Sequence, residues 1–142
     1  MNFQLEVLFR LCLAVLLGGI IGLEREEVHK PAGLKTNILV CIGATLITLF
    51  SFTYFPTAPH IIAAIISGMG FLGAGTILIS KNQILGLTTA AGLWLIAGIG
   101  IAIGAGFYFA AVTSVILAYL VLVYGYKLEE KIKQNRKNKR TH

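Results

Sequence analysis

The densest group of residues that could perform chemistry lies in a polar segment, residues 24–37, between the first two apolar runs of the chain. Its ionisable side chains are Glu24, Arg25, Glu26, Glu27, His29, Lys30 and Lys35. Carboxylate oxygens are ligands for Mg²⁺, which keeps several waters when it binds. However, basic and His side chains crowd the same segment, and Glu26 and Lys30 have the i, i+4 spacing of a helical ion pair. We therefore predict a salt-bridge cluster, and a cation site stays open as the alternative.

A second charged pair lies within the first apolar run. Arg10 is four residues after Glu6, the favourable order for an i, i+4 ion pair. An arginine at the centre of a membrane helix costs about 2.5–3.5 kcal/mol on insertion scales. The favoured interpretation is a neutralised pair that reaches the outer membrane surface. The alternative is an intramembrane charge that faces the helix bundle.

Catalytic or cofactor chemistry is not expected. The three histidines, His29, His60 and His142, are far apart in the chain, and Cys12 and Cys41 lie inside apolar runs. The sequence contains no Ser/His/Asp set and no metal-ligand spacing. Nucleic-acid binding is also not expected, because no aromatic residues interleave with the basic residues of the C-terminal segment. That segment suits attraction to anionic lipid headgroups.

The elements that position these residues are membrane helices. Only 13% of the residues are charged, about half the usual share of a soluble domain, and no acid occurs between residues 28 and 128. A helix needs about 20 apolar residues to cross the hydrocarbon core. The sequence predicts an all-α membrane protein, a bundle of about five transmembrane helices within residues 1–126, followed by a basic cytoplasmic tail, 127–142. The predicted helices are about 5–23, 37–55, 61–80, 87–104 and 107–126.

The distribution of lysine and arginine predicts the orientation. Arg25, Lys30 and Lys35 lie after the first helix, Lys81 lies after the third, and seven basic residues follow residue 126. The segments on the other side hold none. Because basic loops stay in the cytoplasm, we expect the N-terminus outside and the C-terminus in the cytoplasm.

Small residues at helical spacing indicate where helices pack. They occur at Gly18 and Gly22, at Gly100 and Gly104, and along the third helix at Ala63, Ser67, Gly70 and Ala74. Such residues let backbones approach closely in lipid. The glycine-rich stretch 67–75 is interpreted as tight packing, and a broken helix beside a polar cavity is the alternative. Thr88 and Thr89 are expected either to cap the fourth helix or to satisfy carbonyls near its cytoplasmic end. Trp94 is expected to fill a groove between helices.

Three sequence blocks carry a family resemblance. The first block is Arg10-Leu-x-x-Ala14, which continues to Gly18-Gly-Ile-Ile-Gly22-Leu-Glu24-Arg25-Glu26. The second block is Ala32-Gly-Leu-Lys35-Thr36-Asn37-x-Leu-Val-x-Ile-Gly43. The third block joins Ser67-Gly-Met-Gly-Phe-Leu-Gly-Ala-Gly-Thr76 to Gly86-Leu-Thr-Thr-Ala-Ala91 and Trp94. In order and spacing the set resembles the MgtC/SapB family, in its short, SapB-like type without a C-terminal soluble domain. The sequence departs from the family at Lys35 and Asn37, where Arg and His are frequent, and at His60 and Ala64, where Arg and Gln are common.

The resemblance implies a multi-pass protein of the bacterial inner membrane, linked to growth at low Mg²⁺. Together with placement, it suggests two sets of functional residues. The first is a cytoplasmic polar face of Glu24, Arg25, Glu26, Lys35, Thr36, Asn37, Thr88 and Thr89. The second is a packing core of Gly18, Gly22, Ser67, Gly68, Gly70, Gly73, Gly75 and Trp94.

Two functions remain in contention. The leading hypothesis is a regulator that binds another membrane protein, or a second copy of itself, through helix contacts. The alternative is a transporter or channel for Mg²⁺ or another small ion, supported by the hydroxyls of Thr45, Thr48, Ser67 and Thr76. Against transport, no acid lies within the core to offset the cost of a dehydrated divalent ion.

Overall fold

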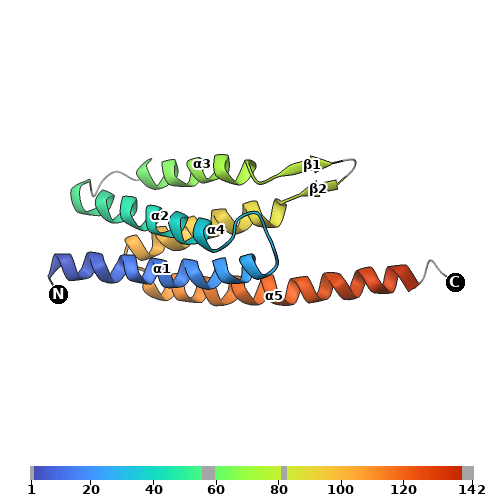
Figure 1. The fold of residues 1–142 in the computed structure, drawn as a ribbon. Helices are drawn as coiled ribbons and strands as arrows, with labels where there is room; N and C mark the ends of the chain where they lie inside the picture. The colour runs from blue at the N-terminus through green and yellow to red at the C-terminus, as the bar shows by residue number, and fades with distance from the viewer. Residues whose placement is uncertain (1, 56–59, 81–82, 139–142) are drawn as a thin grey trace.

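The computed structural model describes residues 2–55, 60–80 and 83–138, and it shows five helices and one short β-hairpin (Figure 1). The elements are α1 (Phe3–Glu27), α2 (Leu34–Tyr54), α3 (His60–Ala74), β1 (Leu78–Ser80), β2 (Gln83–Leu85), α4 (Leu87–Gly104) and α5 (Tyr108–Asn138). The helices run along one common direction and alternate in sense, so the α1–α2 connection and the hairpin lie at the same end. We call this the loop end, and the other end, where α4 turns into α5, the turn end.

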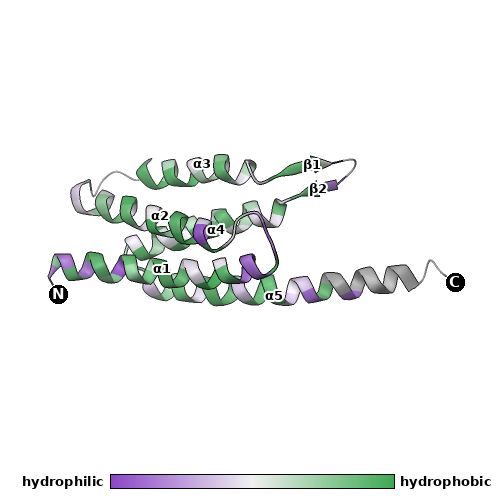
Figure 2. Cartoon of the chain, in the orientation of Figure 1, coloured by the Kyte–Doolittle hydropathy of each residue, from purple (hydrophilic) through white to green (hydrophobic). Residues whose placement is uncertain are grey.

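Apolar side chains cover the outside of the bundle as well as its inside. Among the described residues, four segments are long and apolar enough to cross a membrane: α1, α2, α4 and Tyr108–Leu128 of α5. Large side chains such as Leu16, Leu39 and Phe109 are exposed on the surface. Hydropathy is high along the helices and falls at their ends (Figure 2). A helix that is apolar all round belongs in lipid, and the chain is therefore a multi-pass membrane protein.

The closest helix contacts form where glycines face a neighbouring backbone. A Cβ added at Gly22 would lie 2.8 Å from the Leu34 Cα, and one at Gly18 would lie 3.0 Å from the Cys41 Cβ. Between α2 and α4, a Cβ at Gly100 would lie 2.6 Å from the Cys41 carbonyl oxygen. The absence of side chains at these positions lets α1, α2 and α4 approach closely, as membrane helices must without a hydrophobic driving force.

The third helix is shorter than the sequence predicts. It ends at Ala74, not near residue 80, and its 15 residues measure about 22 Å, less than a full span. The Thr76 hydroxyl and backbone N–H both donate to the Gly73 carbonyl, at 2.8 and 3.0 Å, and close the last turn. The chain then forms an antiparallel hairpin with Leu78 opposite Leu85. The glycine-rich stretch 67–75 therefore forms the second half of α3 and its end, and the helix does not continue beyond it.

Four other boundaries and placements also differ from the prediction. Helix α1 extends to Glu27, and α5 continues without interruption from its apolar half into the basic tail as far as Asn138. The N-cap of α4 is Gly86 in the left-handed conformation, with no side-chain capping bond, so the predicted capping by Thr88 and Thr89 is wrong. Trp94 is 51% exposed, so among the described residues it does not fill the predicted groove between helices.

The stripe of small residues on α3 does not face the bundle. Ser67 and Gly70 are exposed, and added Cβ atoms at Gly68 and Gly70 would meet nothing within 4 Å. At Gly73, an added Cβ would touch Ala90 of α4 at 3.5 Å, which is ordinary van der Waals contact. Helix α3 thus contacts α4 through Gly73 and the buried Met69, and the predicted stripe lies on its outer side.

Candidate functional site

A buried ion pair lies at the loop end, in the last turns of α1. Arg25 Nη2 donates to Glu24 Oε1 at 2.6 Å, and Arg25 Nε donates to Glu24 Oε2. The two side chains are only 6% and 7% exposed. The helical positions suggest that these neighbouring residues point to different sides, yet both side chains bend to meet. A bidentate pair is the geometry that makes burial of two charges tolerable.

Glu26 performs a different task from the one predicted for it. Instead of pairing with Lys30, its Oε2 accepts a hydrogen bond from the backbone N–H of Leu34 at 2.9 Å. Leu34 is the first residue of α2, and the first N–H groups of a helix have no partner within the helix. The carboxylate satisfies one of them and lies at the positive end of the α2 dipole.

Asn37 is a buried structural residue. Its Nδ2 donates to the carbonyl oxygens of Ala32 and Gly33, at 2.9 and 2.8 Å. These bonds fold the connection back onto the first turn of α2, against Gly22. The predicted polar face is therefore divided. Glu24 and Arg25 pair with each other within α1, and Glu26 and Asn37 hold the α1–α2 connection. Thr89 is buried, and Lys35, Thr36 and Thr88 are exposed.

The carboxylates at the loop end are arranged to stabilise the fold and not to coordinate a metal ion. The Glu24 and Glu26 carboxylates are already engaged, so a cation would have to displace Arg25 or the N-terminus of α2. Across the described residues, no group of three or more His, Cys, Asp or Glu side chains is placed to hold a metal ion. The side chains that this end exposes include the basic groups of Lys30 and Lys35, the hydroxyls of Thr36 and Thr88, and the carboxylate of Glu27.

A second polar cluster is centred on Arg10 at the turn end. Its Nε donates to the Tyr108 hydroxyl at 2.9 Å, its Nη1 donates to the Gly104 carbonyl, and its Nη2 bonds Glu6. Gly104 lies in the last turn of α4, where carbonyls lack helical partners and a cation is favoured. Arg10 thus faces the bundle and joins α1 to α4 and α5. Sequence reasoning missed Tyr108, although its place directly after the Gly104–Gly106 turn puts it at this end.

Buried hydroxyls lie between α2 and α4. The Thr45 hydroxyl donates to the Gly100 carbonyl at 3.0 Å, whereas Thr48 Oγ1 is buried without a hydrogen-bond partner among the described residues. A Cβ at Gly104 would lie 2.7 Å from the Thr48 Cβ, so side chains fill this interface. Of the other two hydroxyls considered for transport, Ser67 is exposed and Thr76 bonds its own turn.

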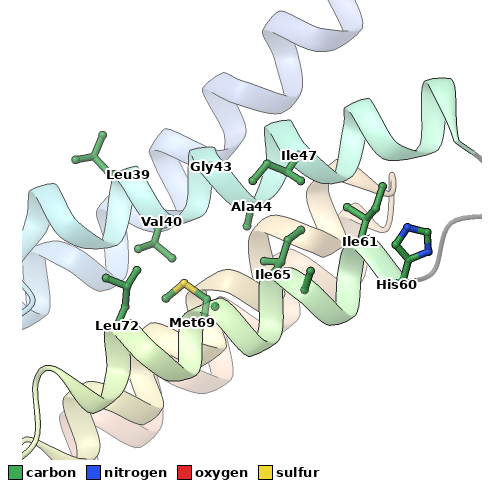
Figure 3. Close-up of a pocket in the computed structure, with 12 residues that line it drawn as sticks. Leu39, Val40, Gly43, Ala44, Ile47, His60, Ile61, Ile65, Met69 and Leu72 are labelled. Carbon is green, nitrogen blue, oxygen red and sulfur yellow. The ribbon is translucent and has the colours of Figure 1, made fainter.

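An apolar groove separates α2 from α3. Figure 3 shows Val40 and Ala44 of α2 facing Ile65 and Met69 of α3 across it. Its volume is about 670 Å³, and small residues from both helices, Gly43 and Gly68 among them, form part of its lining. Because α3 packs mainly on α4, the face of α2 beside it remains open.

Comparison with known proteins identifies the family of this chain. The model of the MgtC family matches residues 11–131. The chain belongs to the MgtC family. The match includes the loop end, the groove and most of α5, while Glu6 and Arg10 fall just outside it.

Several curated relatives share this membership. Protein SapB of Bacillus subtilis (strain 168) is 43% identical over 122 residues, covering 78% of this chain and 53% of that protein. Protein MgtC of Salmonella typhimurium (strain LT2) is 46% identical over 111 residues, covering 78% and 48%. The "Putative magnesium transporter YhiD" of Escherichia coli (strain K12) is 38% identical over 127 residues, covering 82% and 59%. This chain spans about half the length of these MgtC-family relatives. No solved structure matches it.

Proposed function

We propose that this protein is a non-enzymatic protein of the bacterial inner membrane that contributes to Mg²⁺ homeostasis. It does so by regulating another membrane protein through contacts between their helices. Two family relatives support the Mg²⁺ connection, since one is named MgtC and another is named for magnesium transport. The proposed orientation places the loop end in the cytoplasm, because Arg25, Lys30 and Lys35 lie there and basic loops are retained on that side.

The observation that carries the proposal is the groove between α2 and α3. It is apolar, it lies between two membrane helices, and Gly43, Ala64 and Gly68 line it. Helices associate in lipid where small residues let backbones approach. The groove is therefore suited to a transmembrane helix of a partner, with the exposed α3 stripe of Ser67 and Gly70 along its edge.

The polar groups support binding over catalysis. The carboxylates of Glu24 and Glu26 hold the loop end together, and Arg10 holds the turn end. These groups stabilise the bundle, so what remains available for function is its surface. A regulator that acts by contact needs no reactive group of its own.

Site-specific photocrosslinking in native membranes tests the proposal. A photoreactive residue at Ala64, in the groove, is expected to give one discrete adduct with another membrane protein. The same residue at Leu16, on the exposed side of α1, serves as the control and is expected to give only lipid adducts. Filling the groove with Gly68→Leu should remove the Ala64 adduct, while Gly98→Leu, also in open space, should keep it. Unadducted monomer at both positions would contradict the proposal.

Ion transport is the second candidate, and the observation that favours it is the unpartnered Thr48 hydroxyl inside the bundle. Because α2 and α4 are in tight contact around this hydroxyl, transport past it would require the two helices to separate. Liposomes containing the purified protein should show no Mg²⁺ uptake above protein-free liposomes if regulation is the function. Uptake that Thr48→Val abolishes, with the fold intact, would replace our proposal by transport.

A further inference from the structure

A small pocket at the loop end combines basic, hydroxyl and apolar side chains. Its volume is about 180 Å³. Its lining comes from α1, the α1–α2 connection, α4 and α5: Arg25, Lys30, Thr88, Val121, Leu122, Gly125 and Tyr126. None of the functions discussed so far uses it. We propose that this pocket binds a phosphate group, carried by an anionic phospholipid of the adjacent leaflet or by a soluble phosphate compound.

The polar side of the pocket suits an oxyanion. Arg25 is held rigidly because Nε and Nη2 bind Glu24, and within the described part of the chain no hydrogen bond engages its Nη1. Lys30 is exposed and adds the positive charge that Glu24 does not neutralise. Arginine and lysine are the side chains that most often bind phosphate.

The beginning of α4 adds to the same side. Thr88 supplies a hydroxyl, and α4 starts at Leu87 after Gly86, which makes no side-chain capping bond. The first N–H groups of this 18-residue helix therefore have no partner within it, and the helix dipole is positive there. An anion at this position would accept hydrogen bonds from these first N–H groups.

The apolar side of the pocket favours a lipid as the carrier of the phosphate. Val121 and Leu122 of α5 form its membrane-facing wall, one turn before Tyr126 and the basic stretch that begins at Lys127. A headgroup phosphate near Lys30 would place its glycerol and acyl chains along this wall. Basic pockets between membrane helices bind acidic headgroups in this way.

Gly125 leaves the space that such a ligand needs. A Cβ added there would meet nothing within 4 Å. Gly125→Leu can therefore fill the pocket without displacing a neighbour and without changing any charge. This variant separates binding in the pocket from the general attraction of anionic lipid to the basic tail.

Thermal unfolding of the detergent-purified full chain, at about 0.15 M salt, tests the proposal. Dihexanoyl phosphatidylglycerol is expected to raise the unfolding midpoint in a saturable way, because a ligand of the folded state stabilises it. Dihexanoyl phosphatidylcholine at the same concentration should raise it less. Inorganic phosphate, added alone, distinguishes the carriers: a saturable rise of the midpoint equal to that with phosphatidylglycerol identifies a soluble phosphate compound, and no rise at the same concentration identifies the lipid.

Matched variants decide whether the pocket is responsible. Lys30→Gln should weaken the phosphatidylglycerol effect about five-fold, which corresponds to roughly 1 kcal/mol for one basic residue near the surface. Gly125→Leu and Thr88→Val should weaken it as well. Lys35→Gln removes the same charge outside the pocket, and Gly92→Leu adds the same bulk in open space, so both should retain it. Equal effects of the two lipids, or a wild-type response from both Lys30→Gln and Gly125→Leu, would overturn the proposal.

Discussion

At the scale of single residues, charges in this protein serve mainly to fix its ends. Glu24 and Arg25 neutralise each other in a buried pair, and Glu26 completes the first turn of α2. Arg10 binds the end of α4 at the opposite end of the bundle. Glu24 and Arg25 are costly to bury alone and stable only as a pair, and the largely buried Arg10 likewise depends on its partners. The consequences of removing one partner can therefore be stated for each pair.

Removal of one member of the buried pair should destabilise the bundle strongly. Glu24→Gln leaves the Arg25 guanidinium buried without a counter-charge, and we expect a loss of about 3–5 kcal/mol in the free energy of unfolding. Titration with a denaturing detergent, followed by circular dichroism, measures it. Glu27→Gln, an exposed carboxylate of the same turn, is the control and should change stability by less than about 0.5 kcal/mol. Equal effects of the two substitutions would show that the Glu24–Arg25 pair is not buried as described.

The Arg10 cluster should respond more mildly, because its bonds are shared among three elements. Tyr108→Phe removes one hydrogen bond, the one from Nε, and leaves the Glu6 and Gly104 contacts. We expect a loss of about 0.5–1.5 kcal/mol in the same unfolding assay. Tyr119→Phe, at an exposed position of α5, is the control and should be neutral. A cost from Tyr108→Phe no larger than the control's would mean that Arg10 does not use the hydroxyl.

At the scale of elements, the sequence predicts a helix best where helix packing and contact with lipid both require the same run of apolar residues. The fourth helix was predicted as 87–104 and is Leu87–Gly104, because an apolar run between turn glycines leaves little choice of ends. The end of α3 was not predictable in this way. Residues 75–80 are apolar enough to continue a span, and only the Thr76 bonds to Gly73 and the pairing of Leu78 with Leu85 exclude it.

The hydrogen-bond partners of side chains were harder to predict from the sequence than the helices were. Spacing alone favoured a Glu26–Lys30 pair, whereas the chain reversal brings the Leu34 N–H to Glu26. The i, i+4 pair of Glu6 and Arg10 was predicted, but its contact with Tyr108 depends on which helices become neighbours. Local spacing can therefore suggest pairs within a helix, and tertiary contacts decide which of them form.

The glycines of α4 should separate into two classes. A methyl group at Gly100 would lie 2.6 Å from the Cys41 carbonyl oxygen, whereas one at Gly98 would meet nothing. We expect Gly100→Ala to cost about 1–3 kcal/mol through overpacking against α2. Gly98→Ala should be neutral or stabilising by up to about 1 kcal/mol. Unfolding titrations of both variants check the difference, and a tolerated Gly100→Ala would mean that α2 and α4 are further apart.

The hairpin after α3 can be distinguished from a continued helix by crosslinking. In a background with Cys12 and Cys41 replaced by Ala, paired cysteines at Leu78 and Leu85 lie directly opposite in the antiparallel register. Opposed residues of this kind have Cα atoms about 4.5–5.5 Å apart, within disulfide reach. Oxidation should therefore produce an intramolecular bond, seen by mass spectrometry. Cysteines at Leu78 and Ile84, out of register, form the control and should oxidise more slowly.

At the scale of the whole molecule, the alternating helices assign every connection to one of two sides. Figure 1 shows the α1–α2 connection and the hairpin at the loop end, and the α4–α5 turn at the other. Charge then suggests which end faces the cytoplasm, since the basic residues gather at the loop end and along the extension of α5. The structure fixes which connections share a side of the membrane.

Thiol labelling of whole cells tests the orientation. In a background with Cys12 and Cys41 replaced by Ala, a cysteine at the exposed Phe107 should react with a membrane-impermeant maleimide added outside. A cysteine at Lys35 should react only after the membrane is permeabilised. The exposed Phe55, at the end of α2, provides a second outside position. The reverse pattern would place the loop end outside.

The bonds of Arg10 also bear on how the protein is made. A ribosome delivers α1 before α4 and α5, and Glu6 is available to Arg10 as soon as α1 forms, only 4 residues away. Gly104 and Tyr108 follow 94 and 98 residues later, which at about 5–20 residues per second is a delay of about 5–20 s. During this interval α1 has neither its bond to α4 nor its bond to α5. Helix α1 can pack on α2 early, through Gly18 and Gly22, but its bonds at the turn end wait for α4 and α5. Synthesis interrupted before Tyr108 therefore leaves Arg10 without the hydroxyl that binds its Nε.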